Sequence, residues 1–180
     1  MNQLGRLQRI FLLTFVESFS GVLLQRGLYF YTHDVLGFDR SKNLWLALLS
    51  GVAYVIGAVA SHPVSKRSGE RRLLMVTLGG ALSMHLLLMQ NPAPWALMTA
   101  FPAVALFQGF KWPVIESFLS AGLGPKDLVR TLGRFNVVWA ASVPIGLVMA
   151  GQLIGASYPG ALFAAAAASN ALSIAVAIPL

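Results

Sequence analysis

Six long apolar runs, separated by short polar stretches, dominate the sequence. Crossing the hydrocarbon core of a membrane takes about 20 predominantly apolar residues, and charged residues are rare inside each run. The connections between the runs are short, and the longest of them covers residues 120–134. The pattern predicts an all-α polytopic membrane protein with six transmembrane helices, at about residues 10–31, 44–62, 73–89, 94–119, 135–154 and 160–178.

The short stretch between the second and third runs indicates the direction of every helix. It carries a dense group of cationic residues around Gly69, and short loops rich in Lys and Arg stay in the cytoplasm. With alternating helices, nine Lys and Arg residues share the side of this loop, whereas only Arg40 and Lys42 lie on the other. The nine are Arg6, Arg9, Lys66, Arg67, Arg71, Arg72, Lys126, Arg130 and Arg134. We therefore expect a protein of the plasma or inner membrane with both termini cytoplasmic.

The composition supports a membrane protein. Apolar residues make up 57% of the 180 residues and charged residues only 11%, whereas about a quarter of a soluble domain is charged. The mean hydropathy is +0.71. A net charge of +7 would suggest nucleic acid as the partner of a soluble protein, but here the basic residues fall in the loops where membrane topology places them. No nucleic-acid partner is expected, and the absence of Cys excludes disulfides within these residues.

The six runs, the basic loop after the second and a further basic loop after the fourth resemble the N-terminal half of a major facilitator superfamily transporter. The loop signature of that family is approximately G-x-L-A-D-R-x-G-R-R. Alignment on Gly69 also matches Arg67 and Arg71. Lys66 stands at the acidic position of the signature, and Glu70 replaces a basic residue.

This resemblance implies two three-helix repeats and a solute site near the middle of the membrane, between two six-helix halves. Residues 55–58 (VIGA) and 144–147 (PIGL) form a short internal similarity that agrees with such a repeat. The sequence stops at the end of an apolar run without a polar tail. We therefore expect residues 1–180 to be one six-helix domain of a larger transporter, partnered by a second half in the same chain or by a second copy.

Two charged residues inside the predicted helices are the strongest candidates for function. Glu17 and Lys111 each lie about seven or eight residues from the cytoplasmic end of a helix, which places both about 10–12 Å deep. Charges inside a membrane are costly and usually pair or line a polar path. We expect a Glu17–Lys111 pair facing the solute pathway, and a fixed structural salt bridge is the alternative. Protonation of Glu17 would release Lys111, which suits proton coupling.

A narrower resemblance, to proton-coupled oligopeptide transporters, covers the same two helices. Glu17 and Phe19 match the end of the E-x-x-E-R-F-like motif on the first helix of that family, although Thr14 replaces the first glutamate. Lys111 comes shortly before Pro113, as a lysine precedes a proline on the fourth helix of the family. The resemblance implies protons as coupling ions and does not indicate a peptide substrate.

Further candidates for the pathway wall are Arg26, Tyr54, Gln108, Trp112, Asn136 and Trp139. Arg26 lies on the helix face opposite Glu17. It can reach Asp34 or Asp39, point into the cavity toward an anionic solute, or snorkel to the membrane surface. For the aromatic residues, anchoring at the lipid interface is the alternative.

A cytoplasmic gate is expected at the basic loop. Its candidate residues are Arg67, Gly69, Arg71, Arg72 and Glu116. In this interpretation Glu116, near the end of the fourth helix, anchors one of the basic residues Arg71, Arg130 or Arg134.

The motifs of common enzyme classes are absent from the sequence: there is no G-x-S-x-G, no H-E-x-x-H, no P-loop and no Gly-rich dinucleotide turn. The three histidines lie on different segments, so no metal site and no cofactor are expected, and His85 is interpreted as a packed histidine bonded to a neighbour. The expected function is secondary active transport of a small solute by alternating access. The alternative is a small six-helix membrane scaffold or an intramembrane enzyme that acts alone.

Overall fold

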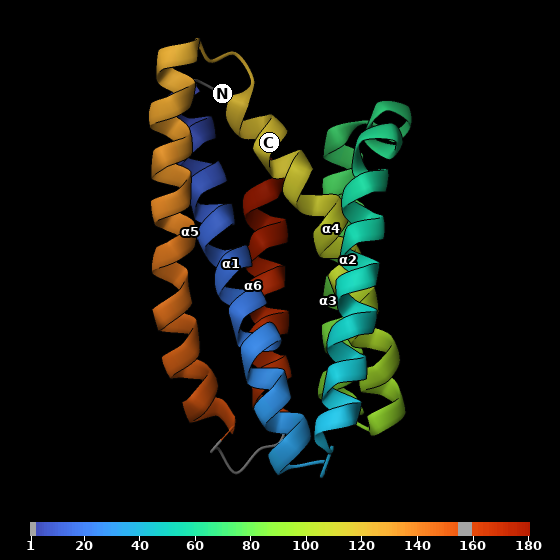
Figure 1. Cartoon of the computed structure of the whole chain (residues 1–180). Helices are drawn as coiled ribbons and strands as arrows, with labels where there is room; N and C mark the ends of the chain where they lie inside the picture. The colour runs from blue at the N-terminus through green and yellow to red at the C-terminus, as the bar shows by residue number, and fades with distance from the viewer. Residues whose placement is uncertain (1–2, 155–159) are drawn as a thin grey trace.

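Six α-helices make up the part of the chain that the computed structural model describes, residues 3–154 and 160–180. The helices are α1 (Gln3–Asp34), α2 (Arg40–Ser68), α3 (Glu70–Gln90), α4 (Pro94–Ser120), α5 (Pro125–Ile154) and α6 (Ala161–Ala177). They form an elongated bundle (Figure 1). The predicted all-α class and the six helices are therefore confirmed, while the expected connection at residues 157–159 lies outside the described residues.

Several helices are longer than the apolar runs predicted. α1 begins at Gln3 and has 32 residues, and α5 begins at Pro125 and has 30. An apolar run marks only the part of a helix that hydrocarbon can cover, whereas the helix itself ends where its hydrogen bonds and caps end. α2 begins early for this reason, because the Asp39 carboxylate accepts a hydrogen bond from the backbone N–H of Lys42 at 2.8 Å.

The connection between α2 and α3 is a single residue, Gly69. α2 continues past Pro63 to Ser68, and α3 starts at Glu70. Gly69 has a φ of 85°, which glycine adopts without steric strain, and its N–H closes α2 by donating to the Ser65 carbonyl at 2.8 Å. The expected basic loop is therefore wrong in extent, because its cationic residues lie on the end turns of two helices.

Four of the helices, α1, α2, α3 and α5, are long and apolar enough to cross a membrane, by length and composition. α6 is apolar but has 17 residues. α4 has 27 residues but is not among these four helices. Its polar residues Gln108 and Lys111 and its internal prolines lower its mean hydropathy. Several long apolar helices indicate a membrane-embedded protein.

The helices form two groups. α1 packs against α5 and α6, whereas α4 packs against α2 and α3. The contact between α3 and α6 joins the groups, and α1 and α4 touch only briefly. α2 and α5 make no contact with each other in the described part of the chain, and they lie on opposite sides of the bundle in Figure 1.

The described ends of the chain lie at one end of the bundle, together with the α2–α3 and α4–α5 connections (Figure 1). The Arg6 guanidinium donates to the carbonyl of Ala121, just after α4. The Arg71 guanidinium donates to the carbonyl of Ile178, just after α6. The segments that carry the nine cationic residues of the predicted cytoplasmic side therefore gather at one end of the structure.

Glycines bring the backbones of α2 and α4 into direct contact. A Cβ atom at Gly57 would lie 2.3 Å from the carbonyl oxygen of Leu106, and one at Gly109 would lie 2.2 Å from that of Tyr54. No real side chain fits at such distances, so these two positions require glycine. Near the same crossing, the Ser61 hydroxyl of α2 donates to a carbonyl oxygen of α4 at 2.7 Å.

A similar crossing joins α1 to α5. A Cβ atom at Gly146 would lie 2.8 Å from the side chain of Val22, and one at Gly27 would lie 3.2 Å from the Cβ of Ala150. Small residues at helix contacts are typical of membrane bundles, in which close packing replaces the hydrophobic effect.

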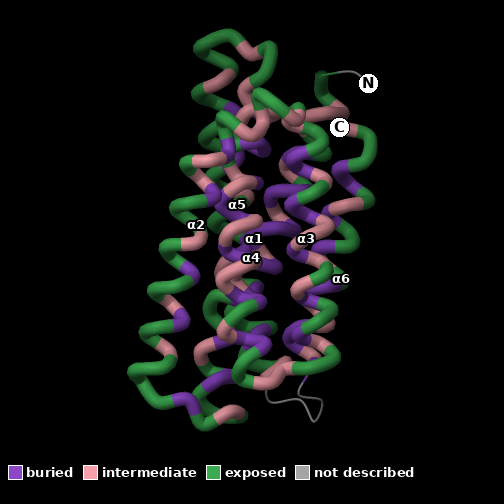
Figure 2. Tube along the Cα trace, turned by 90° about the vertical axis from the view of Figure 1, so that its right-hand side faces the viewer, coloured by how far each residue is buried: buried purple, intermediate pink, exposed green. Residues whose placement is uncertain are grey.

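Burial is unevenly distributed among the helices. α2 has four buried residues, Leu46, Ser50, Gly57 and Ser61, and their spacing makes one narrow stripe that faces α4. Figure 2 shows exposed residues along most of the rest of α2. α5 is similarly exposed, whereas α1, α4 and α6 bury much of their length. α2 and α5 therefore present open faces.

Candidate functional site

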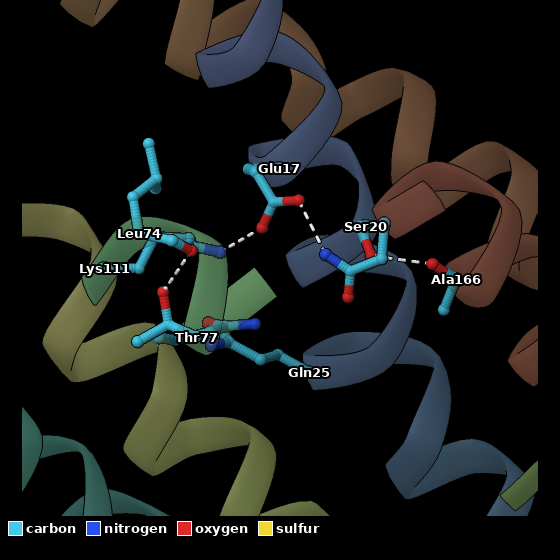
Figure 3. Close-up of polar contacts among 9 residues, drawn as sticks. Glu17, Ser20, Gln25, Leu74, Thr77, Lys111 and Ala166 are labelled. Carbon is cyan, nitrogen blue, oxygen red and sulfur yellow. Dashed lines mark hydrogen bonds and ion pairs between the residues drawn. The ribbon is translucent and has the colours of Figure 1, made fainter. Parts of the chain in front are cut away.

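A buried ion pair joins α1 to α4. The Glu17 carboxylate contacts the Lys111 ammonium, and their side chains are 2% and 3% exposed. Asn170 of α6 donates from Nδ2 to the other carboxylate oxygen of Glu17 at 2.8 Å. Figure 3 shows Glu17 reaching from α1 toward Lys111. The expected pair is thus present, and an amide from a third helix completes it.

The pair belongs to a polar layer between two apolar clusters. One buried polar residue from each of four helices forms this layer: Glu17, His85, Lys111 and Asn170. On α1, for example, Leu13 belongs to the cluster nearer the basic end, and Leu23 belongs to the other. A charge buried in such surroundings costs several kcal/mol unless it is paired and hydrogen-bonded, so each member of the pair depends on the other.

His85 and Asn170 complete the layer but were not expected in it. His85 is 1% exposed, and the charges of Glu17 and Lys111 both act on its ring. Asn170 and the Ala166 backbone also interact with the ring, but neither ring nitrogen reaches hydrogen-bond geometry with a described residue. In the sequence, Asn170 is distinguished only as a single amide residue in an alanine-rich apolar run.

A cavity of about 500 Å³ lies between α1, α2, α4 and α5. This volume falls within the roughly 300–1,000 Å³ of typical ligand sites. Its polar lining residues are Gln25, Arg26, Ser50, Tyr54 and Gln108. Its other aromatic residues are Tyr29, Phe101, Trp112 and Trp139. The cavity thus combines aromatic surfaces, amides and one charged group.

The cavity wall contains some of the predicted pathway residues and not others. Those that line it are Arg26, Tyr54, Gln108, Trp112 and Trp139. Glu17 and Lys111 do not line it, because they are enclosed among α1, α4 and α6. Asn136 is exposed on α5 and lies outside the cavity lining. The sequence interpretation missed Gln25, since its orientation depends on which helices pack together.

The cavity and the buried pair meet at Trp112. The Nζ atom of Lys111 lies 5.2 Å from the centre of the Trp112 ring, and this ring forms part of the cavity wall. Gln108, one turn earlier on α4, lines the same wall. The Trp112 ring therefore borders both the cavity and the Lys111 ammonium.

Arg26 stands without an ionic partner at the edge of the cavity. Among residues 3–154 and 160–180, no carboxylate lies within ion-pair distance of its guanidinium, so the expected contacts with Asp34 and Asp39 are not made. The side chain also borders a neighbouring hollow between α1 and α5, whose wall includes Asp34. Arg26 is exposed, so its charge is available to the cavity.

The expectation that Glu116 anchors a basic residue is wrong. Glu116 is exposed, and it forms no ion pair with any residue that the structure describes. The hydroxyl of its neighbour Ser117 instead donates to the Glu70 carboxylate at 2.6 Å. Glu70 is the first residue of α3, where a negative charge is stabilised by the helix dipole.

The other expected gate residues lie where α2 meets α3. Arg67 is in the last turn of α2, and Arg71 and Arg72 are in the first turn of α3. Gly69 between them forms the connection. These residues thus occupy the end of the bundle, and of the three arginines Arg71 contacts the segment after α6.

The arrangement offers proton exchange and hydrogen bonding. Glu17 is a buried acid whose protonation would remove the counter-charge of Lys111, and the amides and hydroxyls of the cavity can hydrogen-bond a solute. No group of three or more His, Cys, Asp or Glu side chains in the described segments is arranged to hold a metal ion. In comparisons with known proteins, no protein-family model matches the chain and no curated protein matches it.

Proposed function

We propose that the chain is a six-helix unit of a secondary active transporter, similar to the N-terminal half of a major facilitator superfamily protein, and that it moves a small solute by alternating access. The observation that carries the proposal is the buried Glu17–Lys111 pair lying directly behind the wall of a polar and aromatic cavity. Ionisable groups at membrane depth are expensive and are retained mainly for function.

The proposal includes six membrane crossings, so α4 and α6 must cross as well. α4 contacts four other helices, and its polar residues Gln108 and Lys111 are buried against protein. α6 has 17 residues, about 25 Å of helix, close to the hydrocarbon thickness of about 30 Å. With six crossings, the cationic end of the bundle is cytoplasmic.

Matched helix contacts support two three-helix repeats. The α2–α4 contact has its counterpart in the α5–α1 contact, and the α3–α4 contact has its counterpart in the α6–α1 contact. The short internal similarity aligns Gly57 with Gly146. Gly57 is the close-approach residue of α2 toward α4, and Gly146 is that of α5 toward α1.

Protons are the proposed coupling ion. Protonation of Glu17 would leave Lys111 buried without a counter-charge, and the pair would then separate or rearrange. Because Glu17, Lys111 and Asn170 lie on three different helices, a rearrangement would change how these helices pack. Trp112, in contact with the Lys111 ammonium, would transmit the change to the cavity.

A second six-helix unit is the proposed partner. The faces of α2 and α5 that border the cavity expose large side chains, such as Trp139, which is 50% exposed, and Tyr54, which is 37% exposed. In alternating access two units rock around one central site, and these open faces are the surfaces available for that contact.

The proposal is tested by two-sided labelling of the cavity. These 180 residues contain no cysteine, so a Gly51→Cys variant carries a single thiol in them. Gly51 lines the cavity, and a Cβ atom there meets nothing within 4 Å. We expect a membrane-impermeant thiol reagent to label this thiol when it is added to either side of sealed vesicles. The vesicles must conduct no ions, so that a leak does not explain the labelling. Labelling from one side alone would contradict alternating access.

The matched control is Gly79→Cys on α3. This position is equally open, and it does not line the cavity. It should remain unlabelled from both sides, because lipid is its expected surroundings.

A further inference from the structure

We infer that the cavity between α1, α2, α4 and α5 binds an organic monoanion that has a flat apolar body. The inference rests on the proposed function and deepens it, since it names the chemical class of the solute. Three features of the lining carry it: one cation without a partner, hydrogen-bonding groups beside it, and aromatic walls.

The charge of the cavity is positive. Arg26 lines it, and none of its lining residues is acidic. An arginine at membrane depth is costly unless it meets water, a counter-ion or a ligand, and the described carboxylates leave Arg26 unpaired. The nearby Lys111 is already neutralised by Glu17. The charge of Glu116 reaches Tyr54, but Glu116 does not line the cavity.

The amide next to Arg26 is held in position. Gln25 donates from Nε2 to Oε1 of Gln108 at 3.1 Å, linking α1 to α4 in the lining of the cavity. This bond leaves the N–H groups of Gln108 without a hydrogen-bond partner within the described chain. A guanidinium from α1 and an amide donor from α4 in the lining of one cavity suit a carboxylate or sulfonate, which accepts several hydrogen bonds.

Aromatic side chains form the remaining walls. The rings of Tyr29 and Phe101 pack edge to face with centroids 6.4 Å apart, and Trp112 packs in the same way against Phe135 at 6.4 Å. These contacts fix the ring orientations. Trp139, half exposed on α5, adds a surface at the open side. A cavity of about 500 Å³ has room for a solute of one or two rings.

Aromatic walls could also bind an organic cation, and the charges disfavour this alternative. The Lys111 ammonium already lies against the Trp112 ring. A cation in the cavity would in addition face Arg26 without any acidic lining residue to offset the repulsion. The two solute classes therefore differ in sign of charge, which an experiment can separate.

The test uses three naphthalene probes that differ mainly in their charged group: naphthalene-2-sulfonate, its neutral sulfonamide and a naphthylmethyl-trimethylammonium ion. The full chain carrying Gly51→Cys is labelled in detergent with the neutral reagent N-ethylmaleimide. We expect the sulfonate to slow labelling at least fivefold, and the other two probes to slow it less than twofold. Gly79→Cys should label at one rate throughout, which excludes an effect of probe dissolved in the micelle.

Arg26→Gln, added to Gly51→Cys, should abolish protection by the sulfonate, whereas Arg26→Lys should retain part of it. The matched control is Arg130→Gln, which removes an exposed arginine outside the cavity and should leave protection unchanged. Three results would each overturn the inference: sulfonate protection that is unchanged in Arg26→Gln, stronger protection by the ammonium probe than by the sulfonate, or no protection by the sulfonate.

The aromatic walls are tested separately with Trp139→Leu. This variant should weaken sulfonate protection several-fold, while Trp95→Leu, which removes a tryptophan exposed outside the cavity, should not. Failure of the inference and failure of the transporter proposal remain distinguishable. If the cavity is labelled from both membrane sides but prefers the ammonium probe, only the inference that the solute is an anion is overturned. If the cavity binds the sulfonate but is labelled from one side alone, the transporter proposal is overturned.

Discussion

Glu17 accepts from two donors that come from different helices, the Lys111 ammonium and the Asn170 amide. Each carboxylate oxygen has one partner, so the charge is neutralised within the polar layer between the two apolar clusters. Removal of one charge from such a pair is far more costly than removal of both, because the remaining charge stays buried and unpaired.

Lys111→Met should therefore destabilise the protein by about 3–5 kcal/mol. In the double variant Glu17→Gln/Lys111→Met the buried charge is gone, and we expect most of that loss to be recovered. The measurement is unfolding of the wild type, of the single variants Lys111→Met and Glu17→Gln and of the double variant in detergent micelles, analysed as a double-mutant cycle. Additive losses from the two substitutions would show that the pair does not act as a unit.

The pairing of Glu17 with Lys111 could be predicted at this scale, because the depth of each charge followed from its distance to a helix end. His85 and Asn170 could not be placed beside them from the sequence. Burial of an unpaired neutral polar group costs less than burial of an unpaired charge. The position of such a residue along a helix therefore does not reveal which neighbour it contacts. Glu116 shows the opposite error, since a surface carboxylate near many arginines needs none of them.

At the scale of elements, the crossing of α2 and α4 is set by backbone contact. Gly57 and Gly109 leave no space for a side chain, whereas Gly79 on α3 faces open space. The same residue type therefore has opposite consequences in neighbouring helices.

Gly57→Ala should lower the free energy of unfolding by about 1–3 kcal/mol, because the added methyl group must push the backbones of α2 and α4 apart. Gly79→Ala should be neutral or raise stability by up to about 1 kcal/mol through helix propensity. Thermal unfolding of both variants in detergent provides the comparison. Equal effects in the two helices would contradict the close crossing.

The existence and order of the helices could be predicted from apolar runs, but their ends could not. Hydrophobicity reports the part of α1 or α5 suited to lipid, and it is silent about the polar turns that continue each helix. The one-residue connection at Gly69 is a further example: a cluster of charges looks like a loop, although four basic residues can equally occupy two helix ends.

At the scale of the whole molecule, the gathering of the basic segments at one end predicts a topology. Ser41→Cys, at the start of α2, should react with an impermeant maleimide in intact cells, whereas Asp127→Cys, at the start of α5, should react only after permeabilisation. Both positions are exposed. Labelling of both residues in intact cells would contradict the proposed crossings.

The contacts between helices were the least predictable feature of the molecule. That α1 packs on α5, and α4 on α2, depends on surfaces that fit together, and the cavity exists only where these pairs leave space between them. Gln25 became a candidate only through this arrangement, although Arg26, Tyr54, Gln108, Trp112 and Trp139 were anticipated as polar or amphipathic residues within apolar runs.

In the proposed mechanism, the protonation state of the Glu17–Lys111 pair controls which side of the membrane the cavity faces. The groups around Glu17 are Lys111, Asn170 and His85, and Glu17→Gln imitates its protonated form. The direct measurement is the ratio of Gly51→Cys labelling rates from the two sides of sealed vesicles, followed over a range of pH in the wild-type and Glu17→Gln backgrounds.

We predict a ratio that changes with pH in the wild-type background. In the Glu17→Gln background the ratio should stay, at every pH, near the value that the wild type reaches in acid. If the variant instead follows the same pH dependence as the wild type, the pair is a fixed structural bridge and the proposed coupling is contradicted.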